Sequence, residues 1–243
     1  MEYRKTLYEN YHTTQSGRAS TTDAKSLFLR EKWRFQHEIL PLFSQLDKNS
    51  KIYDMGCGSG SLIASLKENG FNHVLGIDLS QEQVQTAHNM GVNEVQFGDA
   101  IEHLKHNTQP YDVIVGTDII EHFTKNELVE LLQLIQKNLK PNGKAIFRTP
   151  NLDAPFASVF ANGDFTHENY MNASSAQQVM MACGFPVVNV LPSMLQVQNP
   201  IKELIRKALY LCLKFFFKAV IFATGRSLQN ILFTPNMIIV AQK

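Results

Sequence analysis

The stretch KIYDMGCGSGSL, residues 51–62, decides the fold. Lys51–Met55 predicts a short strand, and the spacing of Leu62, Ile63 and Leu66 predicts a helix after it. Three glycines, at positions 56, 58 and 60, separate the two. Glycine permits a tight turn with no Cβ between the backbone and a ligand, and a helix N-terminus offers free N–H groups. The sequence therefore predicts the βα unit that opens a ligand-binding α/β fold.

The composition narrows the class of protein. A chain of 243 residues can form one α/β domain with a buried core. A net charge of +1 gives no overall basic field, so we expect no nucleic-acid partner. Cys57, Cys183 and Cys212 form no C-x-x-C pair and the first residues contain no signal-peptide core, which favours a reduced, cytoplasmic location.

Acidic residues accompany the first three predicted strands. Asp54 lies two residues before the first glycine, Asp78 follows a strand at residues 73–77, and Asp99 follows one at residues 94–97. A carboxylate at the end of the second strand is placed to accept hydrogen bonds from ribose hydroxyls. Asp99 has a second interpretation, as the N-cap of the next helix. Four later strands are predicted at residues 111–115, 144–148, 185–191 and 236–241.

These motifs together resemble those of class I S-adenosylmethionine (SAM) methyltransferases. The resemblance rests on G-x-G-x-G after Asp54, on the acids, and on the K-P-x-G turn at residues 140–143. It implies a Rossmann-like, doubly wound seven-stranded α/β sheet in the order 3-2-1-4-5-7-6, with an antiparallel last strand. It also implies SAM contacts from Asp54, Gly56, Cys57, Gly58, Gly60, Asp78, Leu79, Asp99, Ala100 and Thr117.

We expect four segments along the chain. Residues 1–46 form an N-terminal tail, or lid, and a helix, and residues 47–192 form the SAM-binding core. Residues 193–230 form a C-terminal helical insertion, and residues 231–243 return to the core as its last strand.

A second set of polar residues follows the fourth predicted strand. Asp118, Glu121 and His122 are spaced to share one side of a helical turn, and carboxylates with imidazole suit a divalent metal such as Mg²⁺. The spacing resembles E-x-x-E-H in ubiquinone-biosynthesis O-methyltransferases and in small-RNA 2′-O-methyltransferases, with Asp118 in place of the first Glu. That resemblance implies that His167 completes a metal site. Three alternatives stay open: a metal site, a metal-free base formed by His122 or His167 beside Glu121, and simple bracing of the helix.

Further motifs bear on the acceptor. RTPN at 148–151, GDFTHE at 163–168 and the closing N-x-x-x-V-A-x-K resemble methyltransferases of bacterial surface-polysaccharide gene clusters. The resemblance implies that the methyl acceptor is a sugar hydroxyl of a surface glycan or glycolipid precursor. Arg148 and Asn151 would either contact this acceptor or brace their loop. The alternatives are a quinone or lipid-phenol acceptor, and a non-catalytic SAM-fold scaffold at the membrane.

Residues 201–223, IKELIRKALYLCLKFFFKAVIFA, predict a basic amphipathic helix. The lysines at 214 and 218 interrupt any apolar run long enough to span a bilayer. Two interpretations remain: a helix lying in a membrane interface, on the inner face of the cell membrane, or a helix packed on the protein's own core or a dimer partner. The sequence leaves the oligomeric state open.

Overall fold

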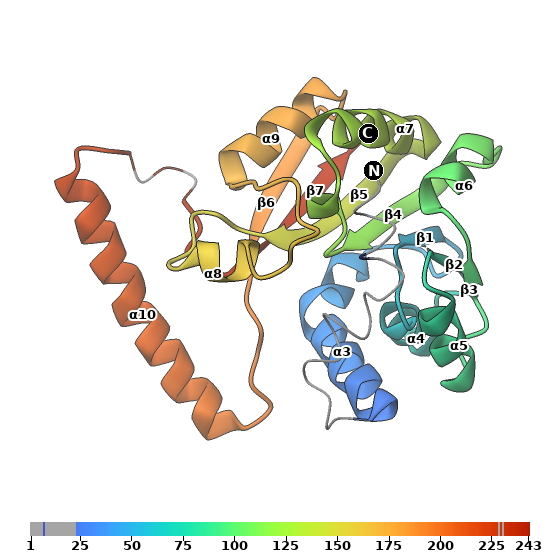
Figure 1. Ribbon diagram of the computed structural model, residues 1–243, viewed down its shortest axis with the longest axis horizontal. Helices are drawn as coiled ribbons and strands as arrows, with labels where there is room; N and C mark the ends of the chain where they lie inside the picture. Colours follow the sequence, from blue (N-terminus) through green and yellow to red (C-terminus); the bar gives the residue numbers. More distant parts are fainter. Residues whose placement is uncertain (1–6, 8–22, 228, 230) are drawn as a thin grey trace.

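A single seven-stranded sheet organises the computed structural model, which describes residue 7, residues 23–227, residue 229 and residues 231–243 (Figure 1). The strand order is β3-β2-β1-β4-β5-β7-β6, as predicted. The lid expected from residues 1–22 falls outside the described residues, Leu7 excepted. The strands are β1 (Lys51–Met55), β2 (His73–Asp78), β3 (Val95–Phe97), β4 (Tyr111–Thr117), β5 (Leu139–Pro150), β6 (Val187–Ser193) and β7 (Asn236–Gln242).

The first five strands run parallel, and β7 runs antiparallel to both β5 and β6. The antiparallel last strand predicted from the sequence is therefore confirmed. Because parallel strands share a direction, the residues that follow β1, β2 and β4 meet at one edge of the sheet. This edge receives the glycine turn, Asp78 and the segment after Thr117.

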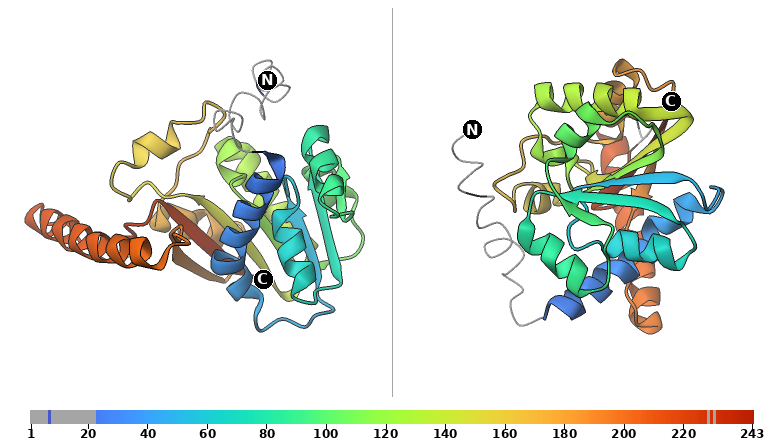
Figure 2. Two further views of the ribbon diagram at one scale, coloured as in Figure 1. Left: turned by 90° about the horizontal axis from the view of Figure 1, so that it is seen from below. Right: turned by 90° about the vertical axis from the view of Figure 1, so that its right-hand side faces the viewer.

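Helices cover both faces of the sheet (Figure 2). One apolar core joins Ile52 and Ile146 to Phe28 and Ile63, and the other joins Tyr53 to helices on the opposite face. Adjacent residues of β1 thus enter opposite cores, as expected for a strand buried on both faces. The first face carries α3 (Ala24–Glu38), η2 (Leu40–Phe43), α4 (Ser61–Glu68) and α5 (Gln81–Asn89), and the second carries α6 (Ala100–His106), α7 (Lys125–Asn138) and α9 (Ala173–Ala182).

β5 begins earlier than the sequence predicted. Leu139 already pairs with Tyr111, and the register then shifts so that Lys144 pairs with Val113. The K-P-x-G turn lies within this irregularity, where Asn142 adopts a left-handed φ of 63°. The turn therefore interrupts the strand as a bulge instead of preceding it.

Three further helices complete the fold. η3 (Ile120–His122) follows β4, α8 (Ala157–Ala161) follows β5, and α10 (Pro200–Ala223) occupies the predicted insertion between β6 and β7. α10 runs alongside the domain near α8 and forms part of neither layer (Figure 1). Within the described ranges, no helix combines the length and the hydropathy that crossing a membrane requires.

Candidate active site

The glycine turn lies beside the end of β2. The N–H of Gly56 donates to the carbonyl of Ile77 over 2.9 Å, and the N–H of Gly58 donates to Oδ2 of Asp78 over 2.7 Å. Gly58 has a left-handed φ of 55°, and a Cβ built on it would meet no atom within 4 Å of the described structure. The turn therefore leaves open space above Gly58, where a ligand can approach the backbone.

Asp78 closes the turn from the other side. Its Oδ1 accepts from the N–H of Ser80 over 2.8 Å, which leaves lone pairs on both oxygens for further donors. Burial raises the pKa of Asp78, although the Gly58 and Ser80 N–H groups lower it. Leu79 beside it is 63% exposed. This arrangement suits a bound diol such as ribose.

Asp54 supplies a second acceptor under the turn. Its side chain is buried, and Oδ1 has no hydrogen-bond partner among the described residues. Burial, and then the charge of Asp78, raise the pKa of Asp54 well above its usual range. A buried acceptor without a donor is costly, and a ligand ammonium group would satisfy it. The orphaned Asp54 oxygen and the open cradle at Gly58 thus fit SAM, whose methionine part carries an ammonium and whose nucleoside carries a diol.

The remaining predicted cofactor residues have structural partners of their own. Oδ1 of Asp99 accepts from the N–H of Ile101 over 2.7 Å and caps α6, as the alternative interpretation held. The carbonyl of Ala100 accepts from the hydroxyl of Tyr53 over 3.1 Å, and Thr117 pairs with Arg148 in the sheet. A cofactor role for Asp99, Ala100 and Thr117 stays a prediction.

Glu121, His122 and His167 come together next to the turn. One donor atom from each lies within 4.8 Å of the other two, and the two imidazole rings meet edge to face with centroids 4.8 Å apart. A Cβ on Gly56 would lie 2.5 Å from Cδ1 of Ile119. The segment that leads into η3 therefore packs directly on the glycine turn, so the two groups of polar residues adjoin.

Hydrogen bonds fix which nitrogen of each histidine carries the proton. Thr166 Oγ1 donates to Oδ1 of Asp164 over 2.6 Å and lies 2.9 Å from Nδ1 of His122. Because the hydroxyl has a single hydrogen, it accepts from Nδ1–H of His122. Nδ1 of His167 likewise donates to the carbonyl of Ala161 over 2.7 Å. With Nδ1 of each ring engaged in this way, Nε2 is the nitrogen that can act as a base or a metal ligand.

Glu121 is the buried member of the group. Its Oε2 accepts from Thr149 Oγ1 over 3.0 Å, and its carbonyl accepts from the N–H groups of Glu168 and Asn169. Burial, and then the charge of Asp118, raise the pKa of Glu121 to about 8. Burial also lowers the pKa of His122, with His167 adding to the effect. A carboxyl and two imidazoles form a donor set that fits a divalent cation.

The structure places Asp118 apart from this group. It has a left-handed φ of 55°, and its carboxylate contacts the guanidinium of Arg148 and lies 3.8 Å from that of Arg34. Arg148 is buried, and its Nε lies 3.3 Å from Oε2 of Glu38 on α3. Asp118, expected as a fourth metal ligand, thus belongs to an ion-pair network with Arg148.

Arg148 and Asn151 both make the bracing contacts that the sequence allowed. Arg148 is held in the network with Glu38, and Asn151 donates through Nδ2 to the carbonyls of Leu232 and Thr234, both over 2.8 Å. Both side chains are buried, and contact of either one with an acceptor stays a prediction. Sequence reasoning assigned no role to Glu38, Thr149 or Thr166. Thr149 and Thr166 lie within the RTPN and GDFTHE motifs, but their tasks depend on partners far away in the sequence.

Comparisons with known proteins show the family and the fold. A family model described as a methyltransferase domain matches residues 28–190. The ubiquinone biosynthesis O-methyltransferase of Rickettsia conorii is 34% identical over 164 residues, which are 62% of this chain and 52% of that protein. The chain thus spans about half the length of the curated relatives it matches.

Solved structures share the fold. A SAM-dependent methyltransferase from Archaeoglobus fulgidus superposes with a TM-score of 0.64 at 24% identity, over 88% of this chain and 94% of that one. Phosphoethanolamine N-methyltransferase 2 of Haemonchus contortus, solved with SAM, has a TM-score of 0.62 at 15% identity, over 97% of this chain and 59% of that one. The prediction of SAM as the cofactor is confirmed at the level of family and fold. The chain belongs to the methyltransferase-domain family and has the fold of the SAM-dependent methyltransferases.

Proposed function

We propose that the protein transfers the methyl group of SAM to a hydroxyl of its acceptor, as an O-methyltransferase. The observation that carries the proposal is that the segment before His122 packs on the open glycine turn and that His122 and His167 lie together there. The cradle fits the cofactor, and the histidines give the hydroxyl a proton acceptor on the same edge of the sheet. The name of the Rickettsia relatives supports oxygen as the methylated atom.

The chain's own residues then have distinct tasks. Asp54 and Asp78 bind and orient the cofactor. When bound, the cofactor supplies a methyl group on a sulfonium sulfur, which leaves as a thioether. His122 or His167 accepts the hydroxyl proton at Nε2, a contribution of roughly 10²–10⁴ in rate. Thr166 and the carbonyl of Ala161 hold the two rings in place. Fixing the acceptor oxygen in line with the methyl group contributes the rest.

A metal-assisted variant uses the same residues. Glu121, His122 and His167 would hold a divalent cation such as Mg²⁺, which would supply positive charge that lowers the pKa of the acceptor hydroxyl. Because burial raises the pKa of Glu121, such a cation would have to displace the proton of this carboxyl and would then favour its ionised form. The metal and the metal-free base remain two forms of one proposal.

Two acceptor classes follow from different observations. The sugar hydroxyl of a surface glycan or glycolipid precursor rests on the RTPN and GDFTHE motifs. The phenol of a quinone precursor is favoured by the relatives named for ubiquinone biosynthesis, which share 34% identity over about half of their length. The two classes differ in hydroxyl pKa, so only the sugar needs strong activation by a base or a metal.

The test is transfer of label from methyl-labelled SAM to a catechol and, separately, to a cell-envelope glycan fraction, with Mg²⁺ or with EDTA. We expect His122→Gln and His167→Gln to reduce turnover by roughly 10²-fold or more. His73→Gln, on an exposed residue at the start of β2, serves as the matched control. Transfer that survives in both site variants would overturn the assignment. SAM binding without transfer to either acceptor would favour the scaffold alternative.

A further inference from the structure

α10 presents its apolar side to solvent. None of its residues is buried, and the large apolar side chains at Leu204, Phe215 and Phe222 are 70%, 64% and 77% exposed. At about 100° per residue, these side chains share one half of the helix circumference. An amphipathic helix on a globular protein normally turns this half toward the core. In α10 the apolar half faces the solvent instead of the core.

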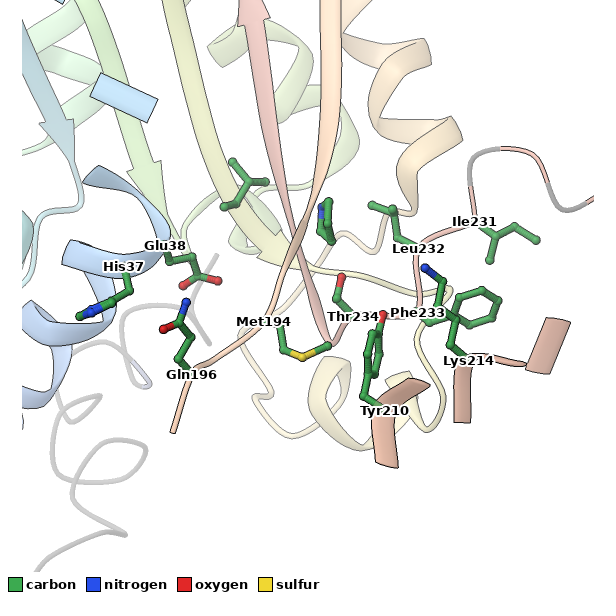
Figure 3. A pocket seen from close by; sticks show the side chains of 12 residues that line it. His37, Glu38, Met194, Gln196, Tyr210, Lys214, Ile231, Leu232, Phe233 and Thr234 are labelled. Carbon is green, nitrogen blue, oxygen red and sulfur yellow. The ribbon is translucent and has the colours of Figure 1, made fainter. Parts of the chain in front are cut away.

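The opposite half of α10 faces the domain and carries most of its polar groups. Tyr210 and Lys214 line a cavity of about 390 Å³ together with Phe233 and Thr234, and Figure 3 shows both side chains reaching from the helix toward these residues. Phe217 stacks on Phe233 with ring centroids 6.4 Å apart. The helix is therefore held to the domain by this mixed side, the half that carries Tyr210, Lys214 and Phe217. Its apolar side is left for another surface.

Charge indicates what that surface is. Residues 194–235 contain six basic residues and one acid, Glu203, although the whole chain has a net charge of +1. Lys202 and Lys207 are exposed and lie on the two borders of the apolar half. This pattern suits a helix lying in an anionic membrane interface, with its apolar side in the acyl chains and its lysines at the headgroups. A second copy of the chain would bring like charges together instead.

The apolar surface continues from α10 to the candidate active site. A second cavity, of about 770 Å³, lies between Leu213 and Phe216 of α10 and Phe156 at the start of α8. α8 ends at Ala161, whose carbonyl holds the ring of His167. Phe156 and Val159 on the α8 side are 75% and 65% exposed. One continuous apolar surface thus runs from the exposed half of α10 to the element that supports the site.

We propose that α10 docks the protein, through this apolar half, on the surface of an anionic phospholipid bilayer. The helix lies in the plane of the interface, and α8 follows it toward the lipid. The inference rests on the orientation and charge of α10 and goes beyond the proposed chemistry. It holds whichever hydroxyl is methylated.

The test is flotation of the full chain with vesicles of phosphatidylcholine alone and of phosphatidylcholine with a quarter phosphatidylglycerol. We expect binding to the anionic vesicles that weakens as salt is raised. Leu204→Gln combined with Phe215→Gln should lower the partition constant at least tenfold. Leu29→Gln combined with Met181→Gln, two exposed apolar residues on α3 and α9, is the matched control and should leave it unchanged. Lys202→Gln combined with Lys207→Gln should lose about fivefold per lysine on anionic vesicles only.

Two outcomes would overturn the proposal. The first is equal flotation of the wild type and the Leu204→Gln, Phe215→Gln variant. The second is a wild type that does not float and is dimeric in solution, while that variant is monomeric. The second outcome would assign the face to another copy. SAM affinity, measured for every variant, separates a docking defect from unfolding. Label transfer to a soluble acceptor, which needs no membrane, is measured in parallel. It tests the proposed function separately from docking.

Discussion

The hydroxyl of Thr149 on β5 donates a hydrogen bond to Oε2 of Glu121 on η3 over 3.0 Å. This is a neutral donor for a carboxyl whose pKa is raised by burial and then by the charge of Asp118. The hydroxyl alone offsets neither effect, so Glu121 keeps a pKa of about 8. The candidate site therefore contains a carboxyl that is largely protonated at neutral pH.

This protonation predicts a pH-dependent stability. Because the folded pKa of Glu121 lies above its ordinary value of 4.5, the folded state binds the proton more tightly, and stability is lost as pH rises toward about 8. With EDTA present to remove metal ions, the free energy of unfolding should fall as pH rises from 6.5 to 8. The ionisation of Glu121 should account for up to about 1.4 kcal/mol of this fall per pH unit. Glu121→Gln, which is neutral throughout, should lack this component. Urea unfolding at both pH values measures it, and equal slopes for the two proteins would contradict it.

Thr166 should act as a positioning residue for His122. Thr166→Val removes the oxygen that accepts from Nδ1–H and lets the proton move to Nε2, so we expect turnover to fall roughly 10²-fold. Thr166→Ser keeps the hydroxyl and should restore most of the turnover. The pH profile of kcat distinguishes this role from a packing role, because only a change of tautomer or ring position shifts its acidic limb. A loss of the same size in the Ser variant would indicate packing instead.

Gly58 and Gly91 form a matched pair for the cofactor site. Both have a left-handed φ, and a Cβ on either meets nothing within 4 Å. Each Gly→Ala change should cost about 1–2 kcal/mol of unfolding free energy through backbone strain. Only Gly58→Ala places a methyl group in the proposed cradle, so it alone should weaken SAM binding, by about tenfold or more. Calorimetry measures the affinity, and unchanged binding by Gly58→Ala would remove SAM from this turn.

The ion-pair network beneath the site should contribute to stability. Arg148 and Glu38 have side chains only 4% and 7% exposed. Arg148→Met strands the carboxylate of Glu38 in the interior and should cost about 3–5 kcal/mol. Adding Glu38→Gln should recover part of that loss, because the charge of Glu38 is then removed together with that of its partner. Denaturant unfolding of the two single variants and the double variant measures the coupling, and additive losses would show that the pair does not interact.

The sequence by itself determined the sheet and its cofactor edge. The glycine turn, the acids at the ends of β1 and β2 and after β3, and the apolar strands were all predicted, and the strand order followed from the family resemblance. These features can be predicted because each depends on a few neighbouring residues: the freedom of glycine at positive φ, the alternation of a strand, the capping of a helix. Glu121, His122 and His167 were also grouped by their motif, and the fold brings them together.

Only the tertiary structure decided what depends on distant partners. Asp118 was expected beside Glu121, but Arg148, thirty residues later, takes its carboxylate. Thr166 reaches His122 across 44 residues, a separation that no local pattern encodes. For α10, the sequence gives an apolar and a basic half but not the half that faces the domain. That choice is made by Phe233 and the residues around it, which offer a surface to the mixed side of α10, and by the rest of the fold, which leaves its apolar side uncovered.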